Sequence, residues 1–172
     1  DELMFLDIDA TFSETEPDYN LIQKIANECR MPLSYGGGVK SVEQAQKIIK
    51  LGAEKVAISS IIFDRPEIIS EMVEVIGRQS VVVVLDVKKN LFGKYDIYTH
   101  NGKKKIKQGL NQTLSILEKI GIGELVINSI DCDGKMKGYD INLVTKIRNS
   151  VSCPLTVLGG ASSQDDILNL IE

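Results

Sequence analysis

The stretch PLSYGGG at residues 32–38 decides the fold. A short apolar run ends in three consecutive glycines, and a helical pattern over residues 42–51 follows at once. Glycine tolerates positive φ angles and has no Cβ, so a ligand can approach such a loop closely. Backbone N–H groups beside a helix N-terminus suit an anion, most often phosphate. The alternative interpretation is a tight strand–helix turn without a ligand.

The same pattern returns as PLTVLGG at residues 154–160, at a constant offset of 122 residues (32 to 154, 37 to 159). Two aspartate pairs, Asp7 with Asp9 and Asp131 with Asp133, correspond at an offset of 124. A repeat of this length is too long for a solenoid and is typical of a duplicated half-barrel. Two glycine loops therefore predict a ligand with a phosphate at each end.

Composition bounds the class of protein. The 172 residues are 43% hydrophobic and 26% charged, which indicates one globular domain over residues 1–172. A net charge of −4 argues against a nucleic-acid partner. No apolar run approaches about 18 residues, so we expect no membrane-spanning helix and no membrane partner. Three cysteines without metal-ligand spacing indicate reduced thiols in a cytoplasmic protein.

Strands and helices alternate strictly along the chain. Apolar runs predict strands at 3–8, 33–35, 55–58, 81–85, 124–130 and 155–158. Helical periodicity predicts helices at 20–29, 42–51, 66–76, 110–120, 141–150 and 163–171. The turn Asn101-Gly102 predicts a hairpin of strands 95–100 and 103–107.

Six β–α units in alternation imply a parallel sheet with helices outside, as an open doubly wound sheet or as a barrel. The repeat and the polar residues that follow each strand favour a (βα)8 TIM barrel of the α/β class. The chain begins within a strand pattern and stops within a helical one, so we expect one unit to be missing from each end.

Asp86 follows the most apolar predicted strand. Burial there would raise the pKa of its carboxyl group and suit it to proton transfer, whereas the alternative is a helix cap or an ion pair with Lys88. Ser59 and Ser60 add hydroxyl groups after another strand, and Gly134 adds an open backbone N–H.

The aspartate pairs do not predict a metal site. No histidine accompanies them, and the twelfth position of a calcium loop starting at Asp131 would be Asn142 rather than Glu. We expect one Asp of each pair to face the pocket and the other to cap or pair. At the opposite strand ends, Glu2, Lys55 and Glu124 form either a charged ring at the barrel floor or separate solvated charges.

Six segments in order resemble the HisA/HisF family, and in particular HisF, the cyclase subunit of imidazole glycerol phosphate synthase. They are ELMFLDIDA, PLSYGGGVKS, GAEKVAISS, QSVVVVLDVKK, NSIDCDGKMKGYD and LGGAS. The segments LDVKK and IDCDGKMKGYD are similar to HisF rather than to the isomerase HisA.

The resemblance implies a role for each candidate residue. Asp86 would be the general acid/base that closes the imidazole ring. The phosphate sites would include Gly38, Ser59 and Ser60 on one side and Asp133, Gly134 and Gly160 on the other, with Asp7 and Asn128 lining the pocket. The gate for ammonia would include Glu2, Lys55 and Glu124, with Gln79 near the entry.

The implied partner is a HisH-like glutaminase that delivers ammonia. The implied substrate is a ribulosyl-formimino aminoimidazole carboxamide ribonucleotide with two phosphates. No metal and no organic cofactor is implied. The family's other catalytic Asp lies on a first strand that this sequence lacks, so we expect residues 1–172 alone to be inactive.

Three departures point to a second interpretation. Ser59-Ser60 stands where HisF usually has Asn-Thr, and Asn128 stands where a Thr is more usual. The segment KKNLFGKYDIYTHNGKKK at residues 88–105 is similar to HisF paralogues found with surface-polysaccharide genes. The resemblance to those paralogues implies an ammonia-relay subunit that serves the conversion of a sugar acetamido group into an acetamidino group.

Overall fold

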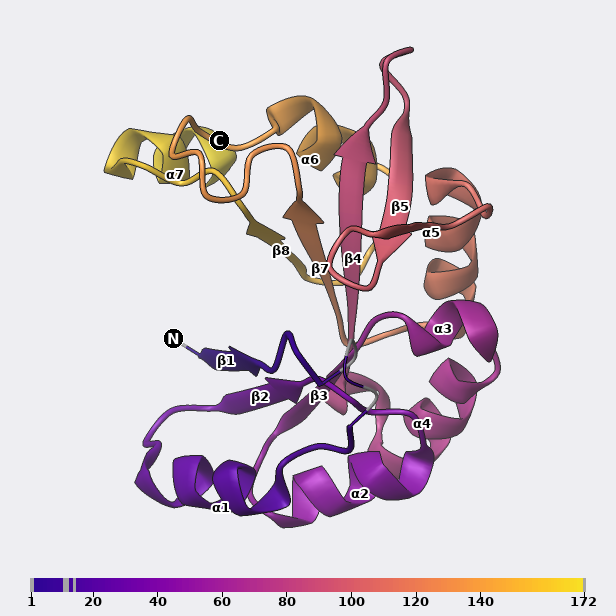
Figure 1. The fold of residues 1–172 in the computed structure, drawn as a ribbon, viewed down its shortest axis with the longest axis vertical. Coiled ribbons are helices and arrows are strands. Elements are labelled where there is room, and N and C mark those ends of the chain that lie inside the picture. Colours follow the sequence, from indigo (N-terminus) through magenta and orange to yellow (C-terminus); the bar gives the residue numbers. More distant parts are fainter. Residues whose placement is uncertain (1, 11–12, 14, 172) are drawn as a thin grey trace. The chain divides into compact units, whose positions relative to one another are not determined.

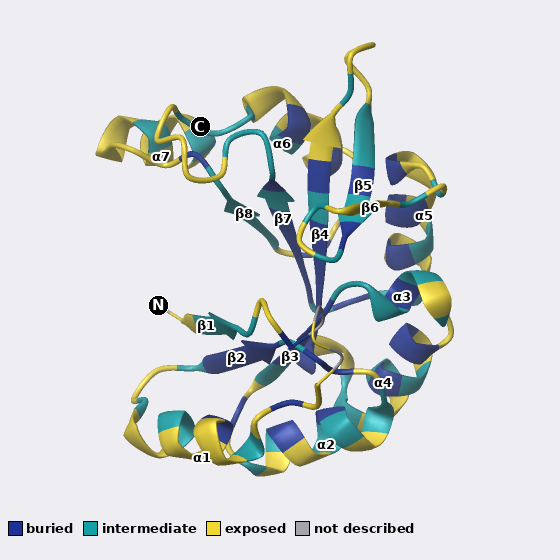
Figure 2. Cartoon of the chain, in the orientation of Figure 1, coloured by how far each residue is buried: buried dark blue, intermediate teal, exposed yellow. Residues whose placement is uncertain are grey.

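The computed structural model describes residues 2–10, 13 and 15–171. The chain divides into two compact units, residues 1–83 and 84–172, and strand β4 passes from the first into the second. Figure 1 shows the elements of each unit, and Figure 2 shows how far each residue is buried.

In the first unit, three strands and the beginning of a fourth form a parallel ladder: β1 (Leu3–Leu6), β2 (Leu33–Gly36), β3 (Lys55–Ile58) and β4 (Val81–Lys89). The helices between them are α1 (Tyr19–Glu28), α2 (Val42–Lys50), α3 (Ile61–Asp64) and α4 (Ile68–Ile76), followed by the 3-10 turn η1 (Arg78–Ser80). All four residues of β2 are buried, as expected of a strand covered on both faces. Ile22, Ile48 and Met72 are among the buried helix residues that complete this core.

In the second unit, β7 (Glu124–Ser129) pairs with β4 and, in parallel, with β8 (Leu155–Leu158). The helices are α5 (Leu110–Ile120), α6 (Ile141–Arg148) and α7 (Gln164–Ile171). The apolar run predicted as the strongest strand is buried throughout from Val81 to Leu85. The six predicted β–α units are therefore all present, and the α/β fold with a mostly parallel sheet is confirmed.

The region after Asp86 differs from the expectation in two ways. Strand β4 continues to Lys89 and forms an antiparallel hairpin with β5 (Tyr95–Thr99), which the sequence pattern did not reveal. The predicted hairpin around Asn101-Gly102 is confirmed, but its second arm, β6, is only Lys104–Lys105. Thr99 pairs with Lys104, so the loop is longer than a two-residue turn, and His100 and Asn101 within it have positive φ angles of 54° and 56°.

Equivalent contacts in the two units confirm the internal repeat. Asp18 caps α1 by accepting a hydrogen bond from the N–H of Leu21 (3.0 Å), and Asp140 caps α6 by accepting one from the N–H of Leu143 (3.0 Å). Each pair lies 122 residues from its counterpart, so the offset read from the sequence is an offset between equivalent structural positions.

Strand β1 is shorter than predicted. The run expected at residues 3–8 ends at Leu6, because the Asp7 carboxylate accepts hydrogen bonds from the N–H groups of Asp9 (3.2 Å) and Ala10 (3.1 Å) and turns the chain. Two local elements were also not predicted, the four-residue helix α3 directly after Ser60 and the turn η1. Within the described residues, no helix has both the length and the apolar character needed to cross a membrane.

Candidate active site

Asp86 and Asn128 meet across neighbouring strands of the second unit. Asp86 lies in β4 and Asn128 in β7, and the Asn128 Nδ2 donates a hydrogen bond to the Asp86 Oδ1 (3.0 Å). Burial raises the pKa of the Asp86 carboxyl group, the Asn128 hydrogen bond opposes that rise, and the negative charge of Asp133 adds to it. A carboxyl group with a raised pKa can exchange a proton closer to neutral pH than an ordinary aspartate can.

The Asn128 hydrogen bond distinguishes the two oxygens of Asp86. It engages Oδ1, so Oδ2 is the oxygen left for a reacting group. The Asn128 Oδ1 is itself buried and has no hydrogen-bond partner among the described residues. This pair is the strongest proton-transfer candidate in the second unit.

The loop after β7 separates the roles of its two aspartates. The Asp131 Oδ2 accepts a hydrogen bond from the backbone N–H of Lys89 (2.8 Å), which fixes the loop to β4. Asp133 is exposed, and its charge acts on Asp86. Asp7, the counterpart of Asp131 in the first unit, likewise binds backbone N–H groups, while Asp9 is exposed. In each pair the first member binds backbone N–H groups, and a pocket-facing role for either member stays a prediction.

The paired glycines of the second unit have a packing reason. A Cβ on Gly159 would lie 2.9 Å from the backbone oxygen of Ser129, and one on Gly160 would lie 2.1 Å from that of Gly138. The Gly138 N–H donates to the Gly160 oxygen (2.8 Å), so the two loops at this end of the sheet are in direct contact. Gly134 differs, because its φ of 68° is positive but a Cβ added there would meet no atom within 4 Å. The space beside Gly134 is open to a ligand.

The glycines of the first unit show the same close packing. A Cβ on Gly37 would lie 2.5 Å from the backbone oxygen of Asp7, and one on Gly38 would lie 2.5 Å from that of Thr15. The N-terminus of α2 is capped from within the chain, because Ser41 and Gln44 exchange side-chain and backbone hydrogen bonds in a capping box. Tight packing therefore accounts for the glycines, and a phosphate at Gly38 stays a prediction.

Ser59 and Ser60 follow β3 directly, and both are half-buried. Their backbone oxygens accept hydrogen bonds from Ile62 (3.3 Å) and Phe63 (3.2 Å) in the first turn of α3. Ser60 occupies the N-cap position of α3 without a capping hydrogen bond from its side chain. Its hydroxyl is thereby left to other acceptors or donors.

At the opposite strand ends, two charged residues predicted for the gate form an ion pair. The Lys55 Nζ lies 2.6 Å from the Glu2 Oε2, with side chains 24% and 31% exposed, and the Ser34 hydroxyl donates to the Glu2 Oε1. Burial acts to raise the pKa of Glu2, but the hydrogen bonds from Lys55 and Ser34 outweigh it and hold that pKa below its usual range.

Glu124 has an equivalent hydroxyl partner in the second unit. It is 7% exposed, and its Oε1 accepts a hydrogen bond from the Thr156 hydroxyl (2.6 Å). The pairs Glu2–Ser34 and Glu124–Thr156 are again 122 residues apart, so a glutamate held by a hydroxyl of the next strand is part of the repeat. Gln79 lies exposed in η1. A ring that joins Glu124 to Glu2 and Lys55 stays a prediction.

The described residues contain no group of three or more His, Cys, Asp or Glu side chains arranged to hold a metal ion. The sequence reasoning missed the hydroxyl partners of both glutamates, although the shared offset of Ser34 and Thr156 would have revealed them as a pair. It also missed that Asn128 contacts Asp86, which no sequence spacing indicates.

These features define an α/β-barrel type of protein, with acidic and glycine-rich groups after the carboxyl ends of parallel strands and a charged pair at the opposite ends. The whole chain, residues 1–172, matches the family described as "Histidine biosynthesis protein". The chain belongs to this TIM-barrel family and is a HisF-like member of it.

Curated relatives support this assignment. The chain is 54% identical over 173 residues to "Putative imidazole glycerol phosphate synthase subunit hisF3" of Vibrio vulnificus, with all of this chain and 66% of the relative covered. It is 47% identical to the similarly named HisF protein of Leptospira interrogans and 39% identical to "Imidazole glycerol phosphate synthase subunit HisF" of Petrotoga mobilis. Both alignments cover all of this chain, and they cover 68% of the Leptospira protein and 69% of the Petrotoga protein. The chain thus spans about two thirds of their length.

Replacing Asn128 with Ala is expected to move the pH profile of turnover. Asn128 lowers the pKa of Asp86 through its hydrogen bond, so its loss should raise that pKa and shift the limb controlled by Asp86 to higher pH. The measurement is kcat/KM against pH for the full-length protein. Asn142→Ala, at an exposed position of α6, is the matched control. An unchanged profile in both variants would contradict the coupling.

Proposed function

We propose that the protein is a cyclase of the imidazole glycerol phosphate synthase type. It would use ammonia to close the imidazole ring of a bisphosphate ribulosyl-formimino aminoimidazole carboxamide ribotide. The observation that carries the proposal is Asp86, which directly follows the buried run Val81–Leu85 within β4 and has a raised pKa and one oxygen held by Asn128. The HisF names of the relatives support the same chemistry.

In this proposal each residue has a defined task. The Asp86 Oδ2 gives and takes protons at the reacting atoms, while Asn128 fixes the carboxylate plane. Gly134 and Asp133 would line one phosphate site together with Gly160, and Gly38, Ser59 and Ser60 would line the other. Asp7 offers only its second oxygen to a ligand, since Oδ1 already accepts two backbone hydrogen bonds.

The proposed partner is a HisH-like glutaminase. Glu2 and Lys55 form a hydrogen-bonded ion pair at the starts of their strands, which is the end where ammonia would enter a barrel. Glu124 is the repeat-equivalent acid, and Gln79 would border the entry.

Replacing Lys55 with Ala is expected to uncouple the two ammonia sources. Turnover driven by glutamine should fall about tenfold or more, while turnover with added ammonium salt should stay within about threefold of the parent, because the chemistry at Asp86 is untouched. The measurement compares both rates in the full-length protein with its glutaminase. Lys50→Ala, at an exposed position of α2, controls for loss of a lysine. Equal losses with both ammonia sources would overturn the gating role.

A second candidate function is an ammonia-relay subunit for the amidination of a sugar acetamido group. The relatives at 54% and 47% identity are named only provisionally, whereas those at 39% and 38% carry the HisF name without qualification. Ser59-Ser60 and Asn128 also depart from the residues that the resemblance to HisF leads us to expect. Such a subunit needs the charged pair at the strand starts, but it does not need tight binding of the bisphosphate.

One experiment separates the two functions. The full-length protein is supplied with the bisphosphate intermediate and ammonium salt, and loss of the intermediate is followed, with Asp86→Asn as the control. Turnover that the control lacks supports the cyclase. A folded protein that neither binds nor consumes the intermediate rules the cyclase out in favour of the relay.

A further inference from the structure

The β4–β5 hairpin presents two large apolar side chains to solvent. Its strands pair from Asp86 opposite Tyr98 to Lys89 opposite Tyr95, and residues 90–94 form the tip. Leu91 is 102% exposed and Phe92 is 90% exposed, the highest values among the exposed large apolar residues that the structure describes. Two adjacent large apolar side chains at a hairpin tip contribute no free energy of burial unless a partner covers them.

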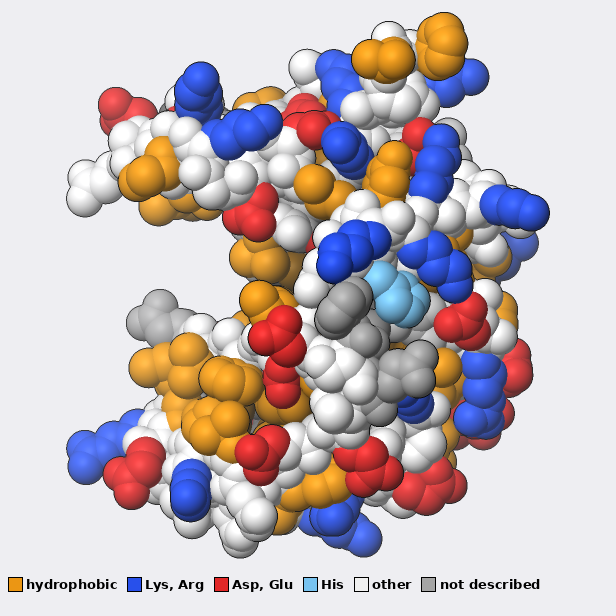
Figure 3. Space-filling view, viewed as in Figure 1, with side chains coloured by type: hydrophobic (Ala, Val, Ile, Leu, Met, Phe, Trp, Pro, Cys, Tyr) orange, Lys and Arg blue, Asp and Glu red, His pale blue; other side chains and the backbone are white. Residues whose placement is uncertain are grey.

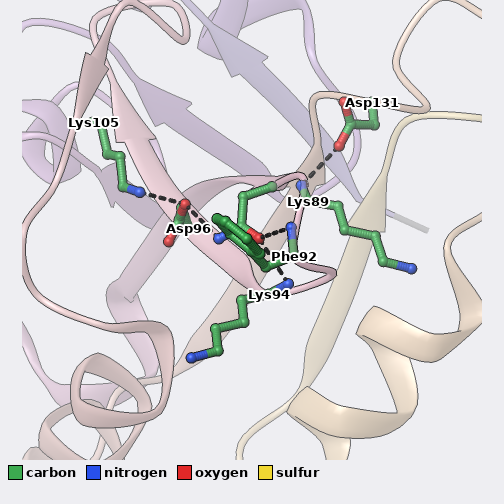
Figure 4. A network of polar contacts seen from close by, with 7 residues as sticks. Lys89, Phe92, Lys94, Asp96, Lys105 and Asp131 are labelled. Atoms are coloured by element: carbon green, nitrogen blue, oxygen red, sulfur yellow. Dashed lines mark hydrogen bonds and ion pairs between the residues drawn. The ribbon is translucent and has the colours of Figure 1, made fainter.

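The tip is held in a fixed shape. The Asn90 Oδ1 accepts hydrogen bonds from the N–H groups of Phe92 (2.9 Å) and Lys94 (3.0 Å), and the Asn90 N–H donates to the Lys94 oxygen (2.7 Å). Gly93, with a φ of 75°, closes the turn through its N–H to the Asn90 oxygen (2.9 Å). Figure 4 shows this network. Ordering Leu91 and Phe92 against a partner therefore costs little backbone entropy.

The last pair of the ladder before the tip, Lys89 with Tyr95, is fixed as well. Asp131 accepts the N–H of Lys89, and the hydroxyl of Tyr95 lies 3.0 Å from both carboxylate oxygens of Asp140. Lys89 and Tyr95 are paired residues of the ladder, so the loop 131–140 braces the hairpin at that point.

The segment 88–107, which includes the hairpin tip and continues past β5 through β6, is strongly basic on an acidic chain. Residues 88–107 contain seven lysines and one acid, Asp96, whereas the other residues contain 13 basic and 23 acidic side chains. All seven lysines are exposed, and Asp96 is bound by Asn90 and Lys105. In the space-filling view, apolar side chains at the hairpin tip lie beside lysine side chains (Figure 3).

We propose that this hairpin docks on an anionic phospholipid surface, with Leu91 and Phe92 inserted among the headgroups and the lysines on the lipid phosphates. Reversible membrane binding needs two signals, and a short apolar wedge with a basic patch supplies both. Such binding lies in the interface and needs no spanning helix. The expectation of no membrane partner rested on apolar run length, which does not test for an exposed hairpin tip.

Two features favour lipid over nucleic acid. Leu91 has no aromatic face for a base to stack on, and the ring of Tyr95 is already covered by the Lys89 ammonium (5.7 Å) and the Lys146 ammonium (6.0 Å). Phe92 is thus the single aromatic ring fully presented at the described tip.

Co-sedimentation of the full-length protein with vesicles tests the proposal. We expect binding to phosphatidylcholine vesicles that contain about 30% phosphatidylglycerol, and loss of binding in pure phosphatidylcholine or in about 0.5 M salt. The triple variant Lys88→Gln, Lys89→Gln, Lys94→Gln should bind about 100-fold more weakly. Lys24→Gln, Lys50→Gln, Lys119→Gln removes the same charge from exposed positions elsewhere and should bind within about threefold of the parent.

A fluorescence measurement tests directly whether the hairpin tip enters the lipid, without a comparison of binding affinities between variants. These 172 residues contain no Trp, so Phe92→Trp adds a reporter at the tip. Its emission should shift to shorter wavelength with anionic vesicles and be quenched by brominated lipid, whereas Met31→Trp should show neither change. Unchanged Phe92→Trp emission on addition of vesicles would overturn the proposal. Tighter binding to single-stranded DNA than to the vesicles would also overturn it. So would a Phe92→Trp side chain that is already shielded from solvent in the full-length protein without lipid.

Discussion

Asp86→Asn is expected to reduce turnover of the bisphosphate intermediate by about 10²- to 10⁴-fold, the usual contribution of a positioned acid or base. Asn has nearly the same shape and can still accept the hydrogen bond from Asn128, so the loss would report the missing proton transfer rather than a collapsed site. The measurement is kcat with ammonium salt in the full-length protein.

The same substitution is expected to raise the free energy of unfolding at neutral pH. Burial raises the pKa of Asp86 in the folded state, so the folded protein binds the proton more tightly than the unfolded chain does. That favourable contribution is complete below the unfolded pKa and is lost as pH rises through the folded pKa. Above it, the wild type retains a buried charge that Asn removes.

Chemical denaturation at neutral pH and at acid pH measures this effect. The gain from Asp86→Asn should be largest at neutral pH and should shrink as pH falls toward the ordinary aspartate value. Asp165→Asn, at an exposed position in the first turn of α7, should instead cause a slight loss, because it removes a charge that the helix dipole favours. If the wild type shows no turnover but Asp86→Asn still stabilises the protein most at neutral pH, the relay function is supported. If Asp86→Asn does not raise the free energy of unfolding at neutral pH, the burial of Asp86 is contradicted.

Gly160→Ala is expected to destabilise the protein by about 3 kcal/mol or more. The added Cβ would lie 2.1 Å from the Gly138 oxygen, a backbone atom that cannot turn aside, and the φ of 106° is unfavourable for any L side chain. Relief requires the two loops to separate, which breaks the hydrogen bond from the Gly138 N–H to the Gly160 oxygen.

Gly134→Ala is the matched control for this prediction. Its φ of 68° also disfavours a side chain, but the space around it is open. The cost should therefore be the backbone strain alone, about 1 kcal/mol. Denaturation midpoints of the two full-length variants give the comparison. Equal midpoints would show that the loops of the second unit do not pack as described.

Much of the fold follows from local patterns. Val81 to Leu85 reads as a buried strand because every residue is apolar, and the amphipathic helices read clearly because one face of each must be covered. The offset of 122 residues predicted equivalent positions, and Asp18 with Asp140 confirmed them as equivalent helix caps. Asp86 was a candidate for proton transfer because of its place after the most apolar strand.

Longer-range features were decided only by tertiary structure. Asn128 contacts Asp86 although they lie 42 residues apart, since the register between β4 and β7 sets that pair and no local pattern encodes it. The extension of β4 to Lys89 was hidden because hairpin strands in solvent need no apolar run. The glycines illustrate both levels: the sequence determined that two loops needed residues without a Cβ, whereas the backbone atoms that require this, such as the Gly138 oxygen, were identified only once the loops were placed together.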